Sequence, residues 1–450
     1  MTTAIPATLP AEFQDQVVQI VSELGVSGYV RLVLDYPGPL DPARLETALR
    51  RLLDAEPVLG CRFALEDGQA LWRRRDDLDA IAGCPVLAGD DLEATTQAWL
   101  AERFDPWQSP NLGIALVRSP AQAGDRLLLR VSHVVADGTA ALDVAMALTD
   151  LYSRLGDDPD YQPSVNTASR DSLLWLANFK FRDKLGLLLD DLKSLPAALG
   201  KRRGLSSTPA RFQADAAQLR PRYRTLRLDE TRLAAIDRYA RAHSATLNDL
   251  CLAAFFRAFD EFCPGPAAAR LEVVMPTNLR RYAPLQRRPA LRNLAGTTAV
   301  RIGTGCGASF EDTLAQVQAE TLRHKRRLLG TEGQIATLLL ARAGFDRKRG
   351  LIRRQILADL NRPAPPVLTH FGHTPARRYA CDGMAPVGLA AFGEASPVPV
   401  FLSALVRMDD RLCVGVCYDQ RLGDLRVDAF LKCLEQNLPG SPQHPIPEKL

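Results

Sequence analysis

The sequence predicts a mixed α/β protein built from two lobes of similar size. The chain has 450 residues, which is more than one ordinary hydrophobic core holds together. Segments with the alternation of β-strands and segments with the period of helices occur in both halves. Between the halves, residues 200–223 are basic, polar and contain proline, as linkers do. We therefore expect an N-terminal lobe over residues 1–199, this linker, and a C-terminal lobe over residues 224–450.

Composition narrows the class of protein. Hydrophobic residues make up 46% and charged residues 24% of the chain, values typical of a globular protein. The net charge is +4, and the basic clusters are short and lack interleaved aromatic residues, so no nucleic-acid partner is expected. The start of the chain lacks a basic region followed by an apolar stretch, and no window holds 18 apolar residues without charge. We expect no signal peptide and no transmembrane segment.

The nine cysteines are scattered, with no CxxC pair and no Cys/His pair at zinc spacing. Several lie inside apolar segments, as Cys251, Cys413 and Cys417 do. The sequence therefore predicts reduced core thiols, no metal site and a cytoplasmic location.

The first lobe opens with a strand over residues 26–36, which alternate and are rich in β-branched side chains. A helix follows, with Asp41 as its N-cap and Pro42 at its first position. Its apolar positions recur at helical spacing: Leu45, Leu49, Leu52 and Leu53. The remaining elements are expected in this order: a strand over 60–68, a helix over 91–104, paired strands over 111–120 and 125–135, and a helix over 139–155.

Residues 171–199 form an unusually apolar stretch, which is expected to be helical. Two interpretations stay open for it. The stretch packs between the lobes, or it forms a lid or a surface that meets a lipid-like substrate.

The second lobe repeats the α/β character. Two helices are expected over residues 231–262, the second beginning after a cap region at Thr246–Asp249. The other predicted elements are strands over 271–282 and 293–303, a helix over 310–329, a strand over 367–375, a hairpin around Asp409 and Asp410, and a helix over 427–438.

One motif carries candidate chemistry. An apolar strand ends in Ser132 and His133, and four residues after the histidine Asp137 and Gly138 turn the chain into a helix. A general base needs a pKa near 7 and a fixed orientation, and histidine meets the first need unaided. Gly138 is expected to permit a backbone conformation that a Cβ would penalise, and Asp137 to face away from the site and pair with an arginine. The alternative is a core histidine beside an ordinary turn and helix cap.

In this context the sequence resembles the HxxxDG acyltransferase superfamily. That group includes chloramphenicol acetyltransferase-like proteins, condensation domains of nonribosomal peptide synthetases, and polyketide-associated and plant-type acyltransferases. The chain is most similar to free-standing, condensation-domain-like proteins. Besides the motif, the resemblance rests on these segments: residues 40–63, 244–259, 273–282, 293–302 and 367–375.

The resemblance implies two chloramphenicol acetyltransferase-like lobes in a V, with a tunnel between them and His133 at its middle as the general base. It also implies that Asp137 forms an ion pair with Arg280, in a structural role. The substrate-binding candidates that it supplies are Ser132, Asn293, Thr297, Thr369, Phe371 and Gly372. Because Ser132 neighbours His133 on a strand, its side chain is expected on the opposite side.

Two departures from the family pattern matter. Peptide-forming condensation domains carry HHxxxDG, and Ser132 replaces the first histidine here, which favours the ester-forming relatives. The plant-type DFGWG segment reads His370-Phe371-Gly372-His373-Thr374, so only its Phe and Gly match. Gly372 is expected to let the backbone approach the channel. His370 and His373 have no adjacent carboxylate and are not expected to bind a metal or act as a second base.

The resemblance implies an acyltransferase that moves an acyl group from a thioester to a hydroxyl or amine acceptor. The donor would be acyl-coenzyme A or a phosphopantetheine-linked acyl group on a carrier protein, with no permanently bound cofactor. Ester formation in lipid or secondary-metabolite biosynthesis is the first interpretation. Amide formation by a free-standing condensation-type enzyme is the second, and a non-catalytic carrier-protein docking module is the alternative of another class. A monomer is expected.

Three basic groups also leave two interpretations open: solvated helix faces, or contacts with the phosphates or acidic surface of the donor. They are Lys201-Arg202-Arg203, Lys325-Arg326-Arg327, and Arg347-Lys348-Arg349 with Arg353-Arg354.

Overall fold

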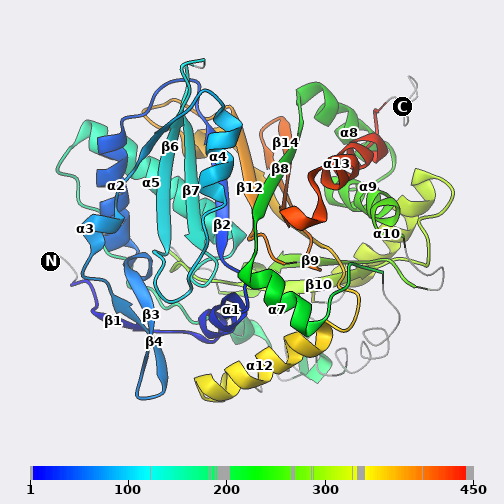
Figure 1. Cartoon of the computed structure of the whole chain (residues 1–450), viewed down its shortest axis with the longest axis horizontal. Helices are drawn as coiled ribbons and strands as arrows, with labels where there is room; N and C mark the ends of the chain where they lie inside the picture. The colour runs from blue at the N-terminus through cyan, green and yellow to red at the C-terminus, as the bar shows by residue number, and fades with distance from the viewer. Residues whose placement is uncertain are drawn as a thin grey trace.

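The computed structural model describes residues 4–441 apart from residues 122, 181, 184, 188, 190–202, 265–268, 285, 287, 327, 332–339 and 398. Elements of the first half and of the second half form two groups that lie side by side, blue to cyan and green to red in Figure 1. Each group has a central sheet, and each sheet is covered by helices. The predicted mixed α/β class is confirmed.

The first group is built on a five-stranded sheet of order β12-β2-β7-β6-β5. Its strands are β2 (Tyr29–Asp35), β5 (Val86–Ala88), β6 (Leu112–Arg118), β7 (Arg126–Ser132) and β12 (Gly388–Phe392). Helices α2 (Pro42–Ala55) and α5 (Gly138–Asp157) pack against each other on this sheet. The predicted start of α2 is confirmed, because the Ala43 N–H donates to Asp41 Oδ1 at 2.9 Å. A separate small sheet contains β1 (Thr8–Pro10), β3 (Cys61–Glu66) and β4 (Gln69–Arg74).

The second group is built on a six-stranded sheet of order β10-β9-β11-β13-β14-β8. Its strands are β8 (Pro221–Leu228), β9 (Glu272–Asn278), β10 (Ala295–Arg301), β11 (Val367–Thr374), β13 (Leu402–Met408) and β14 (Arg411–Asp419). Its helices are α8 (Glu230–Ala242), α9 (Leu247–Phe262), α10 (Phe310–Lys325) and α13 (Asp424–Asn437). The predicted hairpin around Asp409 and the capping box of α9 at Thr246 and Asp249 are both present.

One strand crosses between the groups. β12 comes from the second half of the chain but pairs antiparallel with β2, so that Ala390 lies opposite Val33. An ion pair fixes the chain just after it: Arg31 Nη1 on β2 donates to Glu394 Oε2 at 2.9 Å, and both side chains are buried. The first sheet is therefore completed by a segment that lies beyond the predicted C-terminal boundary of its lobe.

Several predicted element boundaries differ from those of the structure; α10 (Phe310–Lys325), for example, ends four residues before the predicted residue 329. The helix expected over residues 91–104 is α4 (Leu92–Leu100), which ends four residues early. The segment expected as a linker over residues 200–223 contains α7 (Pro209–Ala217) and the first residues of β8. Thr208 caps α7 by accepting the Arg211 N–H, and Phe212 is buried, so this part of the chain packs onto the body of the protein.

The apolar stretch over residues 171–199 is only partly described. Residues 174–178 form a 3₁₀-helix rather than an α-helix. Trp175 and Leu176 pack there against Leu279 and Leu294 of the second half. Residues 174–178 therefore favour packing between the halves, whereas the described residues between 182 and 189 are helical and include the exposed Leu185 and Leu189, so the alternative of a lid or surface stays open. Residues 190–199 lie outside the described part of the chain.

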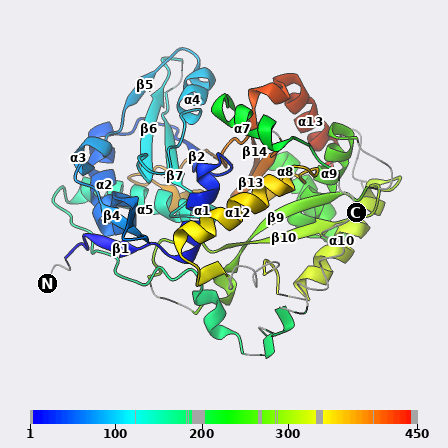
Figure 2. The same ribbon diagram turned by 60° about the horizontal axis from the view of Figure 1, so that its bottom comes forward.

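Helix α12 (Phe345–Asp359) lies against α1 (Phe13–Glu23), as Figures 1 and 2 show. Part of the third basic group makes this contact. Lys348 Nζ donates to Gln16 Oε1 and Arg349 Nε donates to Glu23 Oε2, each at 2.7 Å. Three residues of the other two basic groups lie outside the described part of the chain: Lys201, Arg202 and Arg327. No helix in the described parts of the chain combines the length and apolar character that crossing a membrane requires.

Candidate active site

His133 stands immediately after β7, where the strand leaves the first sheet. Its backbone N–H donates to the carbonyl oxygen of Gly28 at 2.7 Å, and Gly28 directly precedes β2. The neighbouring Ser132 N–H donates to the carbonyl oxygen of Asn111 at 2.8 Å. Backbone hydrogen bonds to the segments that enter β2 and β6 therefore hold the histidine in position.

The imidazole of His133 is largely buried. Burial lowers its pKa from the ordinary value of 6.5, because the charged form loses hydration. Hydrogen bonds from the ring to the backbone at His133 and Ala136, and the negative charge of Asp137, act in the opposite direction. Burial therefore favours the neutral ring, which is the state that accepts a proton.

Asn293 contacts this histidine directly, from the second half of the chain. Its Nδ2 donates to the carbonyl oxygen of His133 at 3.1 Å and lies 3.1 Å from the ring Nδ1. Its Oδ1 accepts the Ala295 N–H at 3.2 Å, which fixes the orientation of the amide. Asn293 is 1% exposed, so its side chain positions the histidine and is closed to solvent. The sequence singled out this residue for contact with substrate and missed the contact with the base.

Asp137 joins three segments through one buried carboxylate. Its Oδ1 accepts the Ala140 N–H at 2.9 Å and so caps α5. Its Oδ2 accepts from Arg280 Nη1 at 2.6 Å and from the Leu294 N–H at 2.7 Å. The predicted ion pair with Arg280 is present. The sequence could not predict the contact with Leu294, because its donor is a backbone N–H, which every residue except proline has.

The structure gives different reasons for the two glycines. Gly138 is an ordinary first residue of α5, and a Cβ there would stand 2.8 Å from the ring of Phe371. Gly138 therefore matters for its close approach to the Phe371 ring, which would have to shift for a Cβ, and not for its backbone conformation. Gly372 shows the reverse: a Cβ would meet open space, but φ is +86°, at the irregularity in β11 between His370 and His373. The explanation expected for Gly138 was wrong, and the approach of the Gly372 backbone to a substrate channel stays a prediction.

The remaining candidates are more scattered. Ser132 is fully buried, and its hydroxyl accepts the Val134 N–H at 3.3 Å, which is a position closed to a substrate. Thr297 is exposed on β10 and Thr369 is half-buried on β11, and both stay predictions as substrate contacts. His370 is largely buried, which lowers the pKa of its ring.

Within the described ranges, no group of three or more His, Cys, Asp or Glu side chains is arranged to hold a metal ion. A small cavity of about 70 Å³ adjoins Arg280 and Ala140, beside the motif. A larger pocket of about 440 Å³ lies between α4 and β8, and its described lining contains no residue of the motif.

Known proteins share this architecture. The first condensation domain of the calcium-dependent antibiotic (CDA) synthetase superposes with a TM-score of 0.67 at 18% identity, covering 97% of each chain. The trichothecene 15-O-acetyltransferase TRI3 from Fusarium sporotrichioides superposes with a TM-score of 0.69 at 12% identity, covering 97% of this chain and 96% of that one. At these identities the likeness shows the fold.

Sequence similarity is more local. Malformin synthetase mlfA from Aspergillus homomorphus is 32% identical over 143 residues, which is 30% of this chain and 3% of the synthetase. No family model matches the chain. The chain therefore has the fold shared by condensation domains and this acetyltransferase, as its motif and flanking segments predicted, and spans only a small part of the synthetase it matches.

We expect Asn293→Asp to raise the pKa of the His133 imidazole, because a carboxylate beside the ring stabilises the imidazolium. An NMR titration of the histidine ring signals measures this shift. Asn361→Asp introduces the same charge at an exposed site and serves as the control. Equal titration of His133 in both variants would contradict the contact.

We expect Arg280→Ala to lower the free energy of unfolding by roughly 3 kcal/mol, because it leaves the buried Asp137 carboxylate without its cation. Urea unfolding measures the change. Arg154→Ala is the matched control, since it removes an arginine from an exposed pair with Asp150, and it should cost under about 1 kcal/mol. Similar losses in the two variants would show that the ion pair between the halves contributes no more to the free energy of unfolding than an exposed pair does.

Proposed function

We propose that this protein is an acyltransferase with His133 as its general base. The observation that carries the proposal is the neutral, largely buried imidazole at the end of β7, held by Asn293 and by the backbone of its own motif.

In the proposed reaction an acyl thioester and an acceptor meet at His133. The Nε2 edge, opposite the Nδ1 edge that faces Asn293, takes the proton of the acceptor hydroxyl or amine as that group attacks the thioester carbonyl. The carbon–sulfur bond then breaks, and the imidazolium returns the proton to the departing thiolate. This requires the resting proton on Nδ1, so in the proposed state the Asn293 amide donates to the His133 carbonyl oxygen and not to the ring.

The thioester donor is acyl-coenzyme A or an acyl group on the phosphopantetheine arm of a carrier protein. Ester formation is the first candidate, because Ser132 stands where peptide-forming domains have a further histidine. The acetyltransferase of the same fold supports this choice, and the condensation domains support amide formation as the second. We propose a monomer, since the two halves already share one site.

A non-catalytic docking module is the alternative of another class. It would bind an acylated carrier protein but would have no use for a neutral histidine positioned by Asn293. Turnover separates the two functions, because a docking module is indifferent to the loss of the imidazole.

We expect His133→Ala to lower acceptor-dependent thiol release by at least about 100-fold, the range that general-base catalysis supplies. Wild type and variant are incubated with a panel of acyl-coenzyme A thioesters and acyl-carrier proteins and with pooled alcohols and amines. Free thiol is followed, and the mass gain of the acceptor separates ester from amide. His243→Ala, at the C-terminal end of α8, is the control. Acceptor-dependent release that survives in His133→Ala would exclude His133 as the base.

We expect kcat/KM for a hydroxyl acceptor to be constant above pH 7 and to fall only below pH 6.5. The lowered pKa keeps His133 unprotonated until the pH drops beneath the ordinary histidine value of 6.5. A pH–rate profile with an alcohol acceptor, which does not titrate in this range, measures the acidic limb. A midpoint above 6.5 would contradict the proposed role of burial.

A further inference from the structure

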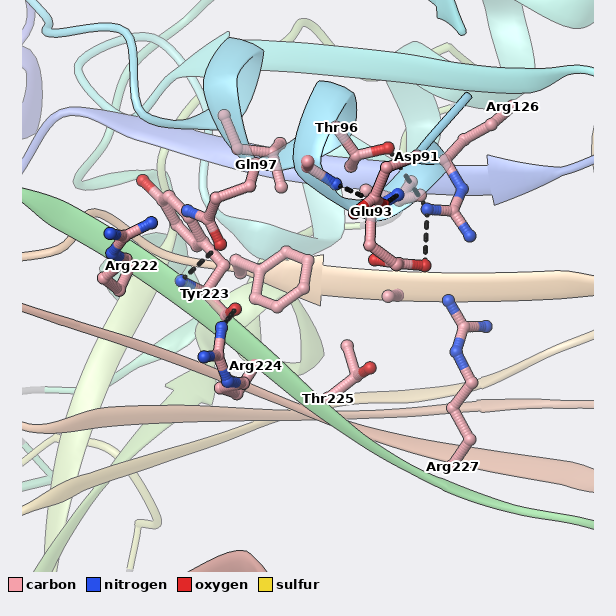
Figure 3. A pocket seen from close by; sticks show the side chains of 15 residues that line it. Asp91, Glu93, Thr96, Gln97, Arg126, Arg222, Tyr223, Arg224, Thr225 and Arg227 are labelled. Atoms are coloured by element: carbon pink, nitrogen blue, oxygen red, sulfur yellow. Dashed lines mark hydrogen bonds and ion pairs between the residues drawn. The ribbon is translucent and has the colours of Figure 1, made fainter. Parts of the chain in front are cut away.

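We propose that the pocket between α4 and β8 binds a small organic anion, a carboxylate or phosphate carried by a flat apolar group. The pocket has a volume of about 440 Å³, within the range of small-molecule sites. Its walls come from α4, β2 and β7 of the first half and from β8 and β12 of the second, as Figure 3 shows. This site is distinct from the His133 motif and does not depend on the proposed acyl transfer.

Two guanidinium groups meet at one end of the pocket. Arg126 Nε lies 2.6 Å from Asp35 Oδ1, and Arg227 Nη1 lies 3.2 Å from Asp35 Oδ2. One carboxylate is therefore shared by two cations, one from each half of the chain. The Arg126 side chain is buried, so water hydrates and screens its charge only weakly.

Two more carboxylates line the pocket on this side: Asp91, which accepts backbone N–H groups at the start of α4, and Glu93, which is largely exposed. Glu93 Oε1 accepts from Arg126 Nη1 at 2.8 Å, but the Glu93 side chain is 76% exposed. An ion pair so open to solvent contributes little stability. A ligand carboxylate or phosphate can take the place of Glu93 and bridge Arg126 and Arg227, since guanidinium groups bind both anions through paired hydrogen bonds.

The edge of β8 supplies further donors. Among the described strands β8 pairs with β14 alone, and the Tyr223 N–H points away from β14 to Gln97 Oε1 at 3.1 Å. Alternation along the strand places the N–H groups of Thr225 and Arg227 on the same edge. Figure 3 shows the side chains of Thr225 and Arg227 rising from β8 on the side of Glu93 and Arg126. An anion at this end therefore meets backbone donors as well as guanidinium groups.

The other end of the pocket combines apolar side chains with polar ones, because Arg222 and Arg224 also line it beside Tyr223. Val33, Ala390 and Phe392 line it, and the Phe392 ring meets the ring of Tyr223 edge-on, with 5.4 Å between centroids. Gln97 Nε2 is buried there and has no hydrogen-bond partner among the described residues. A flat apolar group with an acceptor atom fits beside the Phe392 ring and Gln97 Nε2.

The competing interpretation is that these four charged side chains form only a structural ion-pair network that joins the two halves, here called the clasp. They are Arg227, Asp35, Arg126 and Glu93. The two interpretations differ in what Glu93 does. In a clasp Glu93 helps to hold Arg126, so its loss changes nothing but stability. In a ligand site Glu93 competes with the ligand, so its loss strengthens binding.

Titration calorimetry with the full chain tests the proposal, using phenyl phosphate and benzoate as flat anions and phenol as the neutral counterpart. We expect both anions to bind and phenol not to bind. Arg227→Gln should weaken binding by about tenfold or more, the weight of one charge-assisted contact. Glu93→Gln should strengthen binding. Arg238→Gln removes the same charge from an exposed position on α8 and should leave binding unchanged. The ratio of the two affinities separates a carboxylate site from a phosphate site.

Several results would overturn the proposal. They are no binding of either anion to the wild type, equal binding by Arg227→Gln and the wild type, or weaker binding by Glu93→Gln. Inorganic phosphate binding as tightly as phenyl phosphate would overturn the apolar part of the ligand class. A lower thermal midpoint of Arg227→Gln with no anion binding to the wild type would establish the clasp in its place. Glu93 is exposed, so Glu93→Gln keeps the test valid even if Arg227→Gln fails to fold.

Discussion

The buried carboxylate of Asp137 is the constraint on which the candidate site depends. A buried charge is tolerated only where hydrogen bonds and an opposite charge replace water. Asp137 obtains them from the start of its own helix, from Arg280 after β9, and from the backbone of Leu294 before β10. Because Leu294 adjoins Asn293, the same carboxylate also fixes the amide that contacts His133. The motif is therefore complete only when the second half of the chain has docked onto it.

A second set of contacts ties the histidine to the first half. His133 donates its backbone N–H to Gly28, and Gly28 lies so close to Glu394 that a Cβ would collide with the carboxylate. Glu394 accepts from the Tyr29 N–H and from Arg31, so it fixes both the start of β2 and the segment after β12. Residues remote in sequence thus hold His133 in two ways: Gly28 binds its backbone N–H, and Asn293 contacts its ring. The site belongs to the junction between the halves, as does the larger pocket between α4 and β8.

Local signals explain what the sequence could predict. Asp41 and Pro42 mark the start of α2, the turn at Asp409 marks a hairpin, and an apolar strand followed by Asp137 and Gly138 marks the motif, because each depends on neighbouring residues alone. The partners of each strand could not be predicted. The alternation of apolar and polar residues identifies a strand, but it does not show which neighbouring strand it pairs with. The crossover of β12 and the contact of Asn293 with His133 are of this kind. Composition misled at the linker, where Thr208 and Pro209 begin a helix despite polar, basic surroundings.

The crossover also bears on how the chain acquires its structure. Strand β2 gains β12 as a neighbour only after about 350 further residues have been made. Pairings between such distant segments are slow, because the entropy of closing the intervening loop is lost before the contact forms. Until then one edge of β2 presents unpaired backbone groups, the kind of edge that recruits other chains. During synthesis the sheet of the first half therefore lacks one strand until the second half has been made. In that interval, association between nascent chains competes with folding.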